Sequence, residues 1–133
     1  MIHYVEHGAG RPVVVLHGAG VDHREAEACF EPVLEGVSDL RRIYPDLPGM
    51  GRTIAPETLG SADDVLDTLL DFADAVTGGR PLLLIGHSAG GYYARAMAAV
   101  PGEGGWPGAG LPAAACSPGR PGAPRRRRIG RDR

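Results

Sequence analysis

The 133-residue sequence contains no lysine, only two cysteines and few aromatic residues. Cys29 and Cys116 form neither a disulfide framework nor a metal-ligand spacing, so a reducing compartment is expected. No apolar run approaches the roughly 20 residues that a membrane span requires. The first residues also lack a basic segment followed by an apolar one. These absences predict a cytoplasmic protein that is neither exported nor inserted into a membrane.

Charge and turn-forming residues are unevenly distributed along the chain. Residues 1–102 contain seven arginines and fourteen acidic residues, whereas residues 103–133 contain seven arginines and two acidic residues. Glycine and proline together number nineteen in the first hundred residues and fourteen in the last thirty-three. Such a density is typical of chain that does not form a packed core. We therefore predict one domain over residues 1–102 and a disordered basic tail over residues 103–133.

The first hundred residues alternate between strand-like and helix-like segments. Short apolar runs predict strands at residues 2–6, 12–16, 40–44 and 82–85. Apolar residues at helical spacing predict helices over about residues 22–37, 61–77 and 91–100. This order implies an α/β fold with a mainly parallel sheet flanked by helices. Functional residues are then expected at the carboxyl ends of the strands.

Residues 86–90 read Gly-His-Ser-Ala-Gly, a G-x-S-x-G motif between a strand-like run and a helix-like segment. In this context the glycines allow a strained turn, and Ser88 at its apex projects the hydroxyl above the sheet. The N-terminus of the following helix favours developing negative charge. The alternative is a glycine-rich turn in which Ser88 only caps the helix. The flanking elements favour a serine nucleophile.

Three motifs, taken in order, resemble the N-terminal half of the α/β-hydrolase family. They are residues 17–20 (HGAG), residues 46–51 (DLPGMG) and residues 86–91 (GHSAGG), each after a predicted strand. The resemblance covers about residues 1–102 and implies a partial α/β-hydrolase fold. It also implies hydrolysis of an ester, thioester or amide through an acyl-enzyme on Ser88. The expected partner is a small-molecule acyl substrate, and no cofactor is implied.

The same resemblance assigns roles to residues around Ser88. In the family, the H-G loop and the residue after the nucleophile each supply one backbone N–H to the oxyanion hole, and these correspond to Ala19 and Ala89. His17 and His87 are flanked by turn glycines, which favours a role in orienting the loops over a role as the base. The residues expected to support the motifs are His17, Gly18, Gly86, His87 and Gly90.

The sequence contains no histidine after Ser88, and Glu103 and Asp132 are the only acidic residues after it. In the family that the chain resembles, the catalytic acid and histidine both follow the serine, so Asp46 is expected to be structural. Losing the base lowers the rate of such an enzyme by on the order of 10⁶. We therefore expect little or no activity from this chain alone. A non-catalytic pseudoenzyme or binding module is the alternative function.

Residues 103–133 depart from the family's pattern. Reading one base downstream from Trp106 permits glycine followed by Leu-Val-Leu-Val, so out-of-frame translation of a buried strand is one hypothesis, which the coding DNA would test. The four arginines at residues 125–128 could bind nucleic acid or an acidic surface, and this is the less favoured interpretation of the tail. Without the second half of the sheet, an exposed edge is expected to favour self-association. No metal-ligating constellation is visible in the sequence.

Overall fold

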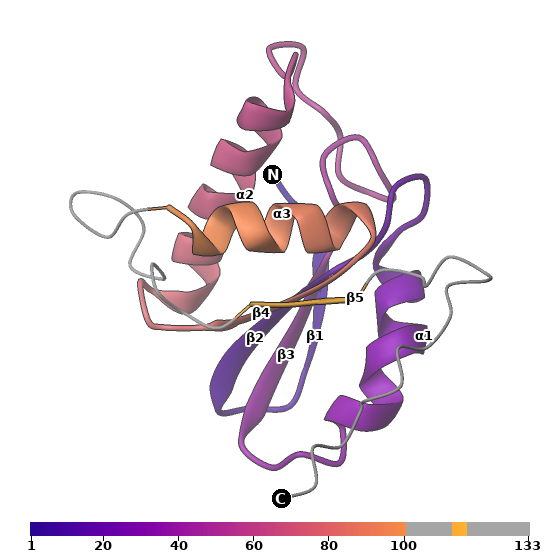
Figure 1. Cartoon of the computed structure of the whole chain (residues 1–133), viewed down its shortest axis with the longest axis vertical. Helices are drawn as coiled ribbons and strands as arrows, with labels where there is room; N and C mark the ends of the chain where they lie inside the picture. The colour runs from indigo at the N-terminus through magenta and orange to yellow at the C-terminus, as the bar shows by residue number, and fades with distance from the viewer. Residues whose placement is uncertain (101–112, 117–133) are drawn as a thin grey trace, which may run out of the picture.

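The computed structural model describes residues 1–100 and 113–116 of the chain (Figure 1). Within these residues the elements, in chain order, are β1 (Tyr4–His7), β2 (Arg11–Leu16), α1 (His23–Leu34), β3 (Leu40–Pro45), α2 (Ala62–Thr77), β4 (Leu83–His87), α3 (Ala89–Ala98) and β5 (Ala113–Cys116). The sheet order is β1-β3-β2-β4-β5. Only β1 is antiparallel to its neighbour, and the other three pairings are parallel. The predicted α/β architecture with a mainly parallel sheet is confirmed.

Strand β2 is buried on both faces and separates two apolar layers. Its side chains alternate, so that Val14 and Leu16 belong to the layer that includes Leu69 of α2 and Met97 of α3. Val13 and Val15 belong to the other layer, which is covered by α1. The continuous apolar run of this strand therefore reflects its position between two sets of helices.

Helix α2 follows its predicted boundaries closely. The Ser61 hydroxyl accepts a 3.1 Å hydrogen bond from the backbone N–H of Asp64, as the capping pattern predicts. Gly78 ends the helix in the left-handed conformation, with φ of 63°. Helix α1 differs from its prediction, because it ends at Leu34 and leaves Val33 and Val37 exposed.

Polar contacts join α1 to the sheet. Glu31 accepts hydrogen bonds from the Arg42 guanidinium at 2.9 Å and from the Tyr44 hydroxyl at 2.5 Å, both on β3. Burial raises the pKa of Glu31, but the hydrogen bonds from Arg42 and Tyr44 outweigh this effect and lower it. Burial and the same hydrogen bond raise the pKa of Tyr44. The ionised form of Glu31 therefore stabilises the packing of α1 on β3.

Replacing Glu31 by glutamine is expected to destabilise the chain by about 1–2 kcal/mol at pH 7, because charge-assisted hydrogen bonds are lost at a partly screened site. Since the folded-state pKa of Glu31 is lowered, its contribution is full above the unfolded value and disappears as the pH falls through the folded value. Urea unfolding from pH 7 to pH 3 should therefore show the two proteins converging in acid. The exposed Glu35→Gln variant is the control. A difference between wild type and Glu31→Gln that is independent of pH would contradict this electrostatic account.

Strand β5 lies in a part of the chain for which the sequence analysis predicted no strand. Residues 113–116 pair in parallel with β4, with Ala113 opposite Leu84 and Cys116 opposite His87. The strand was not predicted, because alanine has a low strand propensity. The predicted disorder of the remaining tail, the frameshift hypothesis at residue 106 and the arginine run at residues 125–128 lie outside the described residues.

The edges of the described sheet are β1 and β5. Self-association through an edge stays a prediction.

No helix within residues 1–100 is both long and apolar enough to cross a membrane.

Candidate active site

Ser88 lies at the sharp turn between the end of β4 and the start of α3. Its backbone has φ of 53° and ψ of −117°, a conformation that is strained for a residue with a side chain. The side chain is exposed and makes no capping hydrogen bond to the helix. Ala89 is the first residue of α3, where the backbone N–H groups have no partner within the helix.

The two outer glycines of the motif are required by close backbone packing. A Cβ on Gly86 would overlap the backbone carbonyl of Gly90. A Cβ on Gly90 would overlap the backbone carbonyls of Leu16 and His17 at the end of β2. The turn therefore holds β4, α3 and the end of β2 against one another, as the sequence motif predicts.

The loop after β2 adjoins this turn. A Cβ on Gly18 would lie 3.6 Å from the Cβ of Ser88 and 3.4 Å from Nδ1 of His87. Ala19, the next residue, is exposed. The structure thus brings the 17–20 motif and the 86–90 motif together at the carboxyl end of the parallel strands.

His17 is fully buried and both of its ring nitrogens have partners. Nε2 accepts a 2.9 Å hydrogen bond from the backbone N–H of Leu47, so the ring proton is on Nδ1, which lies 2.6 Å from the carbonyl oxygen of Gly18. His17 therefore links the loop after β2 to the loop after β3 through both ring nitrogens. In this arrangement neither nitrogen is available to accept a proton from Ser88.

Glu25, on the first turn of α1, is a residue of this region that sequence reasoning missed. Its Oε2 accepts a 3.3 Å hydrogen bond from the backbone N–H of Gly18. Its Oε1 lies 2.5 Å from Nδ1 of His87, although the angles at this contact are not those of a hydrogen bond. Glu25 therefore bridges the loop after β2 and the residue preceding Ser88. Acidic residues are common in the first turn of a helix, so the sequence around Glu25 did not indicate this role.

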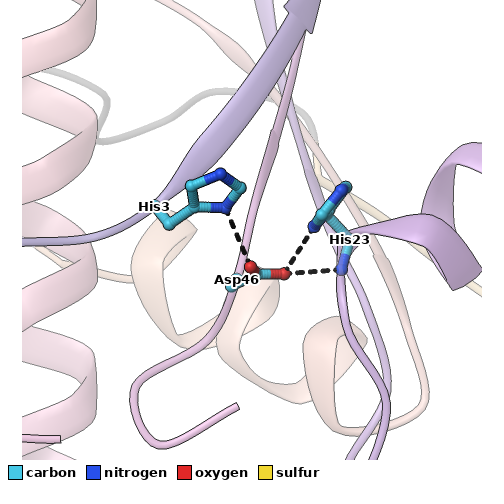
Figure 2. A group of neighbouring side chains, drawn as sticks. All are labelled: His3, His23 and Asp46. Atoms are coloured by element: carbon cyan, nitrogen blue, oxygen red, sulfur yellow. Dashed lines mark hydrogen bonds and ion pairs between the residues drawn. The ribbon is translucent and has the colours of Figure 1, made fainter. Parts of the chain in front are cut away.

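A second polar group lies at the same end of the sheet, around the buried carboxylate of Asp46 (Figure 2). Its Oδ2 accepts hydrogen bonds from Nδ1 of His3 at 2.9 Å and from the backbone N–H of Arg52 at 3.0 Å. Its Oδ1 accepts from Nδ1 of His23 at 2.8 Å and from the backbone N–H of His23 at 2.7 Å. Asp46 therefore joins the start of β1, the start of α1 and the loop after β3, which agrees with the structural role expected for it.

Burial raises the pKa of Asp46, but the backbone hydrogen bonds from Arg52 and His23 and the imidazoles of His23 and His3 outweigh it and lower the pKa to about 2. The carboxylate is therefore ionised at neutral pH. The sequence could not predict this group, because the three side chains that meet here are separated by 20 and 23 positions in the chain.

Comparison with known proteins agrees with this geometry. The model of the alpha/beta hydrolase family matches residues 13–133. The chain belongs to this family.

Two curated relatives and one solved structure are similar to the chain. The (E)-2-((N-methylformamido)methylene)succinate hydrolase of Acinetobacter baylyi is 32% identical over 88 residues, which are 66% of this chain and 32% of that protein. The pimeloyl-[acyl-carrier protein] methyl ester esterase of Shewanella woodyi is 33% identical over 95 residues, which are 70% of this chain and 32% of that protein. An alpha/beta superfamily hydrolase from Oenococcus oeni has 41% identity and a TM-score of 0.67, over 73% of this chain and 36% of that chain. The chain spans about a third of the length of these proteins.

Proposed function

We propose that the chain is the nucleophile-bearing part of a serine hydrolase that acts on a small acyl substrate, an ester, thioester or amide. The observation that carries this proposal is the backbone of Ser88, whose positive φ at a strand-to-helix turn exposes the hydroxyl. The absence of a capping hydrogen bond from this side chain argues against the alternative that Ser88 is only a cap. One similar protein is named as a methyl ester esterase, which agrees with acyl chemistry.

In this proposal the backbone N–H groups of Ala19 and Ala89 bind the oxyanion. Ala89 begins α3, where the helix dipole favours negative charge, and Ala19 follows the glycine that adjoins Ser88. Each such donor contributes typically about 2.7–4 kcal/mol to the stabilisation of the transition state. His17 and Glu25 hold the loop that bears Ala19, through Leu47 and Gly18 respectively.

The reaction begins with attack of the Ser88 oxygen on the acyl carbon, and the hydroxyl proton passes to a base. The base returns this proton to the leaving group as the tetrahedral intermediate collapses to an acyl-enzyme, which water hydrolyses to release the acid. No histidine follows Ser88 in this chain, and both nitrogens of His17 have other partners. We therefore propose that this chain by itself has weak or no turnover.

Labelling with a fluorophosphonate probe tests the nucleophile separately from turnover. At high probe concentration over hours, we expect one adduct on the folded chain, located at Ser88 by mass spectrometry and absent from Ser88→Ala. Ser61→Ala is the matched control, because Ser61 also lies at a helix N-terminus but its hydroxyl already accepts a hydrogen bond. Equal labelling of wild type and Ser88→Ala, or an adduct located at another residue of the folded chain, would overturn the assignment of Ser88.

Hydrolysis of p-nitrophenyl acetate tests the proposed inactivity. We expect the wild-type rate to be indistinguishable from that of Ser88→Ala, because the base is missing. Rapid hydrolysis that Ser88→Ala abolishes would show the proposed inactivity to be wrong while supporting Ser88 as the nucleophile.

A further inference from the structure

A pocket of about 410 Å³ lies beside the Asp46 carboxylate, and none of its lining residues belongs to the Ser88 turn or to the loop at residues 17–20. His3, His23 and Asp46 are all among the residues that line it. The side chains of His3 and His23 are 29% and 14% exposed, so solvent reaches both rings while the carboxylate is buried. The pocket therefore gives small ions a path to these three groups.

The three side chains converge on a small volume (Figure 2). One ligand atom from each lies within 4.8 Å of the other two. The Nδ1 atoms of His3 and His23 lie 2.9 and 2.8 Å from the two oxygens of Asp46. Zinc forms bonds of about 2.0–2.2 Å to imidazole nitrogen and carboxylate oxygen, so neighbouring ligand atoms around it are about 3 Å apart. Only small movements of the two rings would admit an ion between them and the carboxylate.

Two contacts of these groups resemble those of metal ligands, although Arg24 and Arg52 also line the pocket. The backbone N–H groups of His23 and Arg52 donate hydrogen bonds to Asp46. These two bonds would remain if the imidazole rings of His3 and His23 bound a metal ion instead of donating to the carboxylate. Nε2 of His23 lies 3.8 Å from Oε1 of Glu27, one turn further along α1. Histidines that bind metals commonly donate their second ring N–H to a carboxylate, and ligating carboxylates are themselves held by hydrogen bonds.

We propose that His3, His23 and Asp46 form a binding site for one divalent transition-metal ion of the zinc type. Each ring binds through the lone pair of Nδ1 and keeps its remaining proton on Nε2, which for His23 faces Glu27. Two imidazoles and one carboxylate leave further coordination positions, which water from the pocket fills. The hydrogen bonds now made by Nδ1 to Asp46 are replaced by metal–ligand bonds.

Isothermal titration calorimetry of the full chain with ZnCl₂ tests this site. The titration uses a Cys29→Ser, Cys116→Ser background, because thiolates also bind zinc. We expect one ion per chain, a higher melting temperature in the presence of zinc, and at least a tenfold weaker affinity in His3→Ala. The His3→Ala variant is expected to fold, because the backbone of residue 3 still forms its hydrogen bonds to Thr53 and Asp46.

The matched control is His87→Ala, which removes a partly buried histidine that neither belongs to the group nor lines the pocket. It should keep the wild-type affinity, as should Ser88→Ala, so the result does not depend on the proposed hydrolase function. CoCl₂ provides a second measurement, since visible bands typical of nitrogen and oxygen ligands should be present in wild type and lost in His3→Ala. No binding by the folded chain, or equal weakening by His3→Ala and His87→Ala, would overturn the proposal.

Discussion

Replacing Asp46 by alanine is expected to destabilise the chain by about 3–5 kcal/mol, because a buried ionised group is removed from the partners that it satisfies. The carboxylate is fully buried and accepts four hydrogen bonds, two from main-chain N–H groups and two from imidazoles. Stabilities of whole domains are only about 5–15 kcal/mol, so this loss is a large share of the total. Urea unfolding in the presence of EDTA measures it without any contribution from a bound metal ion.

The control for this prediction is Asp67→Ala, on the exposed side of α2. It should change the unfolding free energy by no more than about 0.5 kcal/mol. Asp46→Asn is expected to have an intermediate effect. The oxygen of the asparagine side chain still accepts hydrogen bonds, but its NH₂ group is itself a donor and cannot accept those that the second carboxylate oxygen accepts. A loss below about 1 kcal/mol in Asp46→Ala would show that the three segments hold together without the carboxylate.

Local patterns in the sequence predicted the elements whose formation depends on residues close to one another in the chain. The apolar run of β2 and the cap formed by Ser61 and Asp64 are both contained in a few consecutive positions, and both agree with the structure. The direction of β1 was not predictable in this way, because the pattern of a strand does not show which neighbour it pairs with. The strand β5 was missed because its short alanine run has a low strand propensity.

The same distinction applies to the candidate sites. The turn at residues 86–90 was predicted because its glycines and serine are contiguous. Gly86 is required by packing within the motif, whereas Gly90 is required by packing against Leu16 and His17, which the motif alone does not show. The group around Asp46 forms only when β1, α1 and the loop after β3 come together, so its histidines were indistinguishable from isolated ones in the sequence. Glu25 was missed for the same reason, because its partners Gly18 and His87 lie on other segments.

Gly86→Ala and Gly90→Ala are each expected to destabilise the chain by about 3 kcal/mol or more, or to prevent its folding. In both cases the new Cβ overlaps backbone atoms, of Gly90 in the first and of Leu16 and His17 in the second. A flexible side chain could move aside, but these carbonyl groups belong to the turn and to a central strand of the sheet. Thermal unfolding followed by circular dichroism provides the measurement.

Gly36→Ala is the matched control, because its Cβ would meet only the carbonyl oxygen of Val33 at 3.6 Å, which is ordinary contact. Its melting temperature should stay near that of wild type. If Gly86→Ala folds with reduced stability, the turn that exposes Ser88 should also be displaced, so fluorophosphonate labelling should fall more than the folded fraction does. A Gly86→Ala protein with wild-type stability and labelling would mean that the close contact between β4 and α3 does not position Ser88.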